Sequence, residues 1–299
     1  MSHADHAERM AQTYSTGDFC RVVAAGGDIG FMNLGYAPNP RRPGSTVSRQ
    51  RNVAGMVFEA VSPAAGQALL DVGCGRGGMV NLIGRLVPDA RIIGVNIDRN
   101  QLVTAQAHRA GAATFVAAAA ERLPFADSAF DTVYAVEILS HVSDKTTFAD
   151  EFVRVLRPGG RAVLAFIALT RPYPSFARKE REHLRRVADL FAELPDDIPT
   201  LASARAAFEE AGLRVIACRD LSDGVFTPRH NMFVRMLRWL RHANPLARAG
   251  FAAVVAWRWT LRPQELVDFL AINTASHPGR FYEYHLMTLT KDTERLATA

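Results

Sequence analysis

The fold of this chain is decided by the stretch Asp71-Val72-Gly73-Cys74-Gly75-Arg76-Gly77-Gly78. It follows the continuous apolar run 68–72 and opens a helical pattern over residues 77–86, which Pro88 ends. A glycine-rich turn between a strand and a helix is the usual context of a nucleotide-binding loop. Gly73 and Gly75 permit a tight turn and a close approach of the backbone to a ligand. The stretch therefore predicts a ligand at this turn.

Outward from the turn, short apolar runs alternate with helical patterns. The runs are continuous, as expected for strands that are covered on both faces of a parallel sheet. They predict strands at 68–72, 91–96, 113–117, 132–136, 161–167, 214–219 and 282–290, and helices at 77–86, 99–110, 146–156 and 203–211. We expect Pro158-Gly159-Gly160 to stop the third of these helices. This alternation predicts an α/β fold with a Rossmann-like, doubly wound, mostly parallel seven-stranded sheet.

Four regions are expected along the chain. They are an N-terminal helical cap (1–65), the ligand-binding core (66–220), a helical insertion (221–280) and a final core strand with a tail (281–299). Residues 231–269 are rich in Trp, Phe, Met and Arg, and we expect helices there that form a lid over the carboxyl ends of the strands. Their apolar side chains either pack inward or line an acceptor pocket.

Composition excludes several classes of protein. The chain has 299 residues and a net charge of +5, but its basic residues are spread along the sequence, so we expect no nucleic-acid partner. The three cysteines are far apart and form no metal-binding spacing, which predicts a reducing cytoplasm and no metal site. The apolar stretch 250–257 is too short to span a bilayer, and the N-terminus has no apolar signal core. A small molecule is the expected partner, with the oligomeric state left open.

The acidic residue before the glycines indicates the charge of the ligand. The carboxyl group of Asp71 would repel a phosphate, whereas it would attract a cationic amino group. The turn therefore predicts a nucleoside that carries an ammonium group and no phosphate. S-adenosylmethionine has this chemistry. The alternative is a Rossmann domain that does not use this cofactor.

Four segments in a fixed order resemble the motifs of class I S-adenosylmethionine-dependent methyltransferases. They are DVGCGRGG (71–78), RIIGVNID (91–98), AAAERLPFADSAFDTVYAVEILSHV (118–142) and EFVRVLRPGGRAVLAF (151–166). Outside them, the segment FMNLGY (31–36) and the region 214–231 are similar to methyltransferases that tailor polyketide macrolides and related natural products. The resemblance implies methyl transfer to a small natural-product acceptor. A hydroxyl oxygen is the expected target, with nitrogen and carbon left open.

The resemblance also implies which residues bind the cofactor. Asn96 would bind the ribose hydroxyls, Gln50 the cofactor carboxylate, and Ile97, with Leu123, the faces of the adenine. Glu137 either faces the cofactor or caps the next turn, and Gln101 lies either in the site or on the surface. The full set is Tyr36, Gln50, Asp71, Gly73, Cys74, Gly75, Asn96, Ile97, Gln101, Ala120, Glu121 and Glu137.

Two positions depart from the family pattern. Asn96 stands where the family has an acid at the end of the second strand, and its hydrogen bonds are roughly half as strong without charge assistance. Ala119 stands where the family has an adenine-binding acid. These departures favour altered cofactor contacts and motivate an alternative function, a cyclisation or rearrangement without net methyl transfer. A non-catalytic scaffold is a third hypothesis.

Two histidines are candidates for the base that a hydroxyl acceptor needs. His141 follows the fourth predicted strand at the edge where parallel sheets present ligands, and the pKa range of imidazole suits proton uptake near neutral pH. The alternative is a loop histidine that bonds the backbone. His230 is the second candidate. No acid is evident directly after the fifth strand, where the sequence is Phe166-Ile167-Ala168, so we expect no paired carboxylate. Tyr14, Asn33 and Tyr36 could close over the methionine end of the cofactor, and the alternative for Tyr36 is a packed aromatic side chain.

Overall fold

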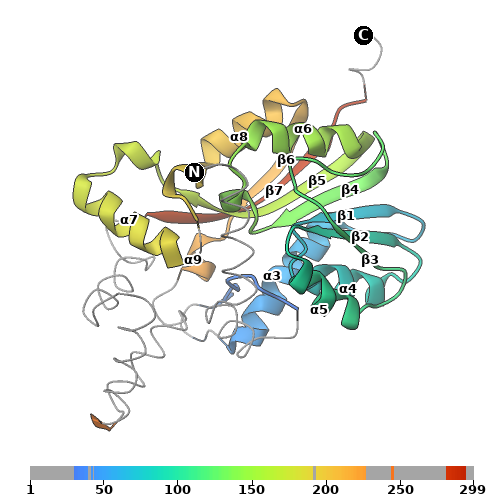
Figure 1. Cartoon of the computed structure of the whole chain (residues 1–299), viewed down its shortest axis with the longest axis horizontal. Coiled ribbons are helices and arrows are strands. Elements are labelled where there is room, and N and C mark those ends of the chain that lie inside the picture. Colours follow the sequence, from blue (N-terminus) through green and yellow to red (C-terminus); the bar gives the residue numbers. More distant parts are fainter. Residues whose placement is uncertain are drawn as a thin grey trace.

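The computed structural model describes residues 30–39, 42, 44–190, 193–226, 244–245 and 281–293. The side chains of residues 186, 187, 189 and 190 are not described. A seven-stranded sheet with helices on both faces forms the described part of the chain (Figure 1). The strand order is β3-β2-β1-β4-β5-β7-β6. Strands β1 to β5 pair in parallel, whereas β7 runs antiparallel to both β5 and β6. The prediction of a Rossmann-like, mostly parallel sheet is confirmed.

The strand bounds follow the apolar runs closely. They are β1 Ala68–Val72, β2 Arg91–Asn96, β3 Thr114–Ala117, β4 Phe130–Val136, β5 Leu156–Leu169, β6 Leu213–Asp220 and β7 Tyr282–Lys291. The largest difference is at β5, which was expected to begin at residue 161. Leu156 pairs with Phe130 and pairing resumes at Arg161 with Thr132, so Pro158-Gly159-Gly160 forms an irregularity inside the strand rather than a turn before it.

Polar caps begin several of the helices. The Asp98 side chain accepts from the amides of Asn100 and Gln101 at the start of α5, and Asp144 accepts from the Thr147 amide in α6. Such caps satisfy amides that have no partner within the helix. The α-helices are α3 Thr46–Val61, α4 Gly78–Leu86, α5 Arg99–Ala107, α6 Lys145–Val155, α7 Arg178–Leu190, α8 Leu201–Glu210 and α9 Ser222–Val225, and the 3₁₀ turns are η1 Leu139–His141, η2 Tyr173–Ser175 and η3 Pro195–Asp197. Helix α5 ends three residues earlier than predicted.

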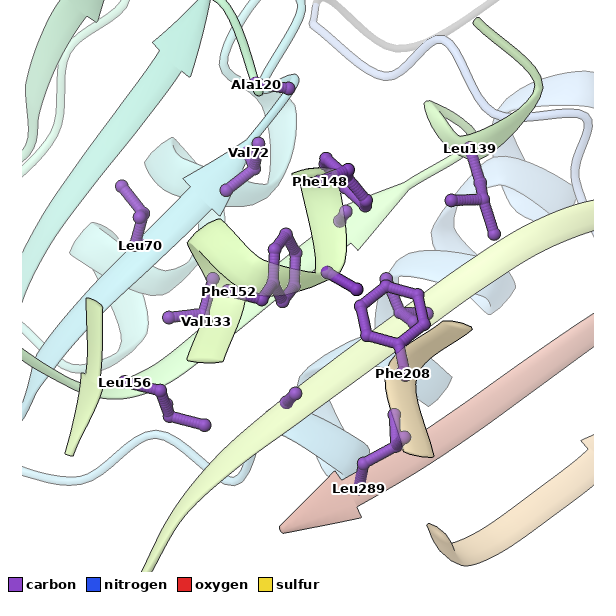
Figure 2. Packing of buried hydrophobic residues seen from close by; sticks show 14 of the residues in the cluster. Leu70, Val72, Ala120, Val133, Leu139, Phe148, Phe152, Leu156, Phe208 and Leu289 are labelled. Atoms are coloured by element: carbon purple, nitrogen blue, oxygen red, sulfur yellow. The ribbon is translucent and has the colours of Figure 1, made fainter. Parts of the chain in front are cut away.

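Two apolar layers hold the helices against the sheet. Figure 2 shows Phe148 and Phe152 of α6 and Phe208 of α8 packed on one face of the sheet, in a cluster that includes Val133 of β4 and Leu289 of β7. The rings of these three phenylalanines lie 4.8–6.0 Å apart. On the opposite face, α3, α4 and α5 bury side chains such as Val57, Ile83 and Leu102. Burying a side chain of this size contributes about 1.5–3 kcal/mol, so both layers stabilise the sheet that presents the site.

The carboxyl ends of β5 and β6 lie at the same edge of the sheet as the start of β7. Leu169, the last residue of β5, pairs with Tyr282, the first residue of β7. Asp220, the last residue of β6, pairs with His285. The chain therefore leaves the sheet after β6 and returns to it in β7 at the edge where β1 to β5 end.

The helices predicted for 231–269 lie outside the described residues, apart from positions 244 and 245. The boundaries of the four regions stay predictions. Within the part of the chain that the structure describes, no helix has both the length and the apolar character needed to cross a bilayer.

A close helix contact gives a test of the packing. A Cβ atom on Gly84 of α4 would lie 2.4 Å from the carbonyl oxygen of Ala110. We expect Gly84→Ala to lower the free energy of unfolding by about 1–3 kcal/mol, because the backbone must shift to admit the methyl group. The matched control is Gly55→Ala in α3, where a Cβ atom meets nothing within 4 Å. It should raise stability by about 0.5–1 kcal/mol. Urea denaturation measures both, and equal values would contradict the packing described here.

Candidate active site

The glycine-rich turn after β1 requires glycine at its first position. Gly73 and Gly75 have φ angles of 80° and 53°, in the left-handed region that favours glycine. A Cβ atom on Gly73 would lie 2.5 Å from Cδ1 of Ile138. At Gly75 the nearest atoms would be Gln101 Oε1 at 3.4 Å and Met32 Sδ at 3.5 Å. The turn thus brings backbone close to residues from β4, α5 and the N-terminal part of the chain.

Asp71 lies under this turn rather than beside it. Its side chain is buried, and it pairs in register with Tyr134 of β4. Burial raises the pKa of Asp71 to about 7, against the opposing effect of Tyr134. A ligand cation near the turn would favour the ionised carboxylate. Cys74 also points inward, since a Cβ atom on Gly94 would lie 2.8 Å from its Sγ, and burial raises the pKa of its thiol.

The N-terminal strap, defined here as residues 30–39, is fastened to helix α3. Gln50 Nε2 donates to the carbonyl oxygens of Phe31 and Asn33, both at 3.2 Å. Asn33 Nδ2 donates to the carbonyl oxygen of Gln50 at 3.3 Å. Arg49 donates to the carbonyl oxygens of Leu34 and Gly35. These side chains of α3 satisfy the backbone of a segment that has no regular structure.

The ring of Tyr36 packs against the backbone of α9. A Cβ atom on Gly224 would lie 2.0 Å from the ring, and the Ala37 amide donates to the Gly224 carbonyl oxygen at 2.9 Å. Tyr36 therefore anchors the strap to the segment that follows β6. Its predicted cofactor contact stays a prediction.

Glu137 joins the strap to the sheet. It directly follows β4 and has a φ angle of 56°, which is uncommon for a residue with a side chain. Its Oε1 accepts from the Leu34 amide at 2.9 Å and from the Tyr284 hydroxyl at 2.8 Å. Burial raises the pKa of Glu137 to about 7. These contacts give Glu137 a role in fixing the strap, a possibility that the sequence did not suggest.

The end of β2 carries a small polar network. Asn96 Nδ2 donates to Gln101 Oε1 at 3.0 Å, and Asn96 Oδ1 accepts from the Ile97 amide at 3.0 Å. Gln101 is buried, so the alternative that placed it on the surface is wrong. Ile97 is 40% exposed at the same edge, which leaves an apolar surface for a ring to contact. The structure thus brings Asn96, Ile97 and Gln101 together.

The loop after β3 follows the same edge. The Ala118 amide donates to the carbonyl oxygen of Asn96 at 3.2 Å, which ties the start of the loop to the end of β2. Ala120 is buried and Glu121 is half-buried. Leu123 is buried in the apolar layer, and its amide donates to Glu151 Oε2 at 2.6 Å. The loop is therefore fixed in place at both ends.

His141 lies in η1, beyond the end of β4, and it faces an acid that the sequence analysis missed. Its Nε2 lies 3.7 Å from Oε1 of Glu193, and both side chains are buried. Ser140 donates to the same Glu193 oxygen at 2.6 Å. The expectation of no paired carboxylate was wrong, because the acid comes from the segment after α7 rather than from the end of β5. His230 and Tyr14 lie outside the described residues.

Three buried oxygen atoms test whether these residues suit S-adenosylmethionine. Asn33 Oδ1, Gln50 Oε1 and Asp98 Oδ2 have no hydrogen-bond partner among the described residues. All three accept hydrogen bonds, and buried acceptors without donors are costly. A ligand with an ammonium group and ribose hydroxyls offers such donors, so the residues fit this cofactor. The amide hydrogens of Gln50 are directed at backbone carbonyls, and the contact expected with the cofactor carboxylate is therefore not supported.

The buried carboxyl of Glu137 predicts a pH-dependent difference in stability. An acid whose pKa is raised in the folded state binds more protons there than in the unfolded chain, so its contribution to stability falls as pH rises from about 4.5 to about 7. Gln at this position carries no charge and keeps the Oε1 acceptor. We expect Glu137→Gln to gain stability relative to the unaltered chain between pH 5 and pH 8.

Urea denaturation at the two pH values measures this gain. Glu59→Gln, at an exposed position of α3, is the matched control and should show little change with pH. A gain of the same size in both variants would contradict the burial of Glu137.

Sequence comparisons agree with this geometry. Residues 70–164 match the model of the methyltransferase domain family. The O-methyltransferase rstn1 of Aspergillus nomiae is 33% identical over 199 residues, which make up 65% of this chain and 85% of that protein. The region that matches the family model begins within β1, contains the glycine-rich turn and ends within β5.

Two solved structures have the same fold. Geranyl diphosphate C-methyltransferase from Streptomyces coelicolor, in complex with Mg²⁺, geranyl diphosphate and S-adenosyl-L-homocysteine, aligns with a TM-score of 0.66 at 15% identity, over 96% of this chain and 98% of that chain. The [4+2]-cyclase SpnF aligns with a TM-score of 0.69 at 21% identity, over 96% and 97% of the two chains. With the ordered motifs, the glycine-rich turn after β1 and the matched relative, the chain belongs to the class I S-adenosylmethionine-dependent methyltransferases.

Proposed function

We propose that this enzyme transfers the methyl group of S-adenosylmethionine to a hydroxyl oxygen of a small natural-product acceptor. One observation carries the choice of a hydroxyl group: a buried histidine, His141, lies beside a carboxylate at the edge of the sheet where the cofactor turn ends. A hydroxyl group is a poor nucleophile until a base removes its proton. A neutral amine or an alkene carbon can attack with an electron pair that it already holds and lose a proton afterwards. The similarity to a fungal O-methyltransferase supports the same acceptor atom.

The residues that would hold the cofactor follow from the buried acceptors. Asn33 and Gln50 would accept from its ammonium group, and Asp98, with Asn96, from its ribose hydroxyls. Ile97 would contact a face of the adenine, and Gly73 and Gly75 would admit the ligand close to the backbone. When bound, the cofactor supplies an electrophilic methyl group. Gly30 and Met32 of the strap lie beside this turn and would exclude water from it.

The chain contributes positioning and proton removal. Holding a nucleophile about 3–3.5 Å from the carbon that it attacks supplies much of the rate increase in such displacements. His141 would accept the hydroxyl proton at one ring nitrogen. Residues 221–280 would contribute the acceptor side of the site, and 66–220 the cofactor side. The free cysteines, Cys74 and Cys218, suit a reducing compartment, and we propose the cytoplasm.

The test is transfer of a labelled methyl group. The purified chain is incubated with S-adenosylmethionine labelled in the methyl group and with a panel of polyketides that carry phenolic or aliphatic hydroxyls. Release of S-adenosylhomocysteine together with a labelled ether product is the expected result. Conversion of a polyketide without either product would favour the cyclisation hypothesis, which the shared fold of SpnF and the departures at Asn96 and Ala119 keep open. Labelled product on nitrogen or carbon alone would overturn the hydroxyl assignment.

A further inference from the structure

We propose that Glu193 is a positioning residue for His141, because its carboxylate orients the imidazole and stabilises the protonated ring after proton transfer. This inference rests on the proposed function, in which His141 is the base. It adds a residue from outside the matched domain, since that domain ends at residue 164. The side chain is supplied by the segment that follows α7, and Figure 1 shows α7 beside the end of the sheet at which β7 begins.

The two side chains are largely buried and lie close enough to form an ion pair when His141 is protonated. The 3.7 Å between His141 Nε2 and Glu193 Oε1 is within ion-pair range and longer than a hydrogen bond. Only 9% of the His141 side chain and 7% of the Glu193 side chain are exposed. Solvent screens a buried pair weakly, so its charges interact more strongly than those of a surface pair.

The carboxylate is held in place from several directions. The Ser140 hydroxyl donates to Glu193 Oε1 at 2.6 Å, and the Glu193 amide donates to the Ala188 carbonyl oxygen at 2.9 Å at the end of α7. Four residues further on, Asp197 Oδ2 accepts from the Ser143 hydroxyl at 3.3 Å. The segment 193–197 is thus docked on the loop that carries His141. Such fixed geometry is what a positioning role requires.

Several ionisable groups surround the pair. Burial raises the pKa of Glu193 to about 7, while Ser140 and Lys145 act in the opposite direction. The pKa of Lys145 is itself lowered to about 8 by burial, and its ammonium group donates to the Val142 carbonyl oxygen. The other ionisable groups that face this cluster are Glu137, Tyr282, Glu121, Asp144 and Asp197.

Loss of the carboxylate charge would disfavour the protonated ring. When the base has accepted a proton in a buried site, an imidazolium without a charge partner is costly. The proton affinity of His141 should therefore fall when Glu193 is neutral, and the base should weaken with it.

A titration that needs no acceptor tests the pairing. Proton–carbon correlation spectra of the full chain, labelled with ¹³C in histidine, follow the ring signals from pH 5 to pH 9, and the His141→Ala variant assigns the His141 signal. In Glu193→Gln, whose Oε1 can still accept from Ser140, we expect the titration midpoint of His141 to move to lower pH by about one unit or more. Asp150→Asn, which removes an exposed carboxylate of α6 outside this cluster, is the matched control and should leave the midpoint in place. An unchanged midpoint in Glu193→Gln would overturn the proposal.

Kinetics with an acceptor from the polyketide panel separates this inference from the proposed function. Glu193→Gln should lower kcat by up to about tenfold for each unit of lost proton affinity, because the rate follows the strength of the base only in part. It should have no further effect in the His141→Ala background. Full turnover in His141→Ala would refute the base itself, whereas an inactive His141→Ala with a fully active Glu193→Gln would refute only the role of Glu193.

Discussion

Replacement of His141 by alanine is expected to lower turnover by about 10²- to 10⁴-fold, the usual contribution of a positioned base. Cofactor binding should be retained, because the hydrogen bonds that fasten the strap and the end of β2 are made by Glu137, Gln50 and Asn96. Calorimetry with S-adenosylhomocysteine measures binding, and labelled methyl transfer measures turnover. The loss should therefore appear in kcat and not in the cofactor affinity.

A surface histidine provides the control for this experiment. His108, at the end of α5, is exposed, and His108→Ala should keep full turnover. Turnover in His141→Ala equal to that in His108→Ala would remove His141 from the mechanism.

Gly75→Val is expected to weaken the binding of both S-adenosylmethionine and S-adenosylhomocysteine by more than about 100-fold, which corresponds to about 2.7 kcal/mol. The backbone of Gly75 has a φ of 53°, and a β-branched residue in this region costs on the order of 1–3 kcal/mol. The added methyl groups would also occupy the space between Gln101 and Met32, through which the cofactor would approach the protein backbone. Calorimetric titration of the folded variant measures the loss.

Gly66→Val separates strain from the loss of the site. Gly66 has a φ of 78°, and a Cβ atom there meets nothing within 4 Å. It precedes β1, at the end of that strand opposite the cofactor turn. Gly66→Val should therefore lower stability while leaving the cofactor affinity unchanged. Equal losses of affinity in the two variants would mean that backbone strain, and not the site, explains the effect at Gly75.

The fold could be read from the sequence because its signals are local. A buried strand such as β1 is a continuous apolar run, and a turn such as 71–78 carries its own glycines. The start of β5 was missed because Pro158-Gly159-Gly160 is typical of a turn, and only its pairing across the sheet makes it part of a strand. Local patterns thus located the elements, and long-range pairing shifted their ends.

The site was less predictable because its key contacts join distant residues. Ser140 and Glu193 are 53 positions apart, and no spacing in the sequence connects them. Likewise, Gln50 was expected to face the cofactor carboxylate, but the orientation of its amide depends on the backbone carbonyls of Phe31 and Asn33. Residue type indicated which side chains are polar and buried. Only the tertiary arrangement shows which atom of each side chain remains available.

The return of the chain at a single edge of the sheet makes the enzyme modular. Because β6 ends and β7 begins on the same side, 226–281 could be exchanged with the corresponding segment of another family member without altering the register of either strand. Under the proposed function, in which this segment contributes the acceptor side, such a chimera would change the choice of acceptor while the pairing of β6 with β7 is kept.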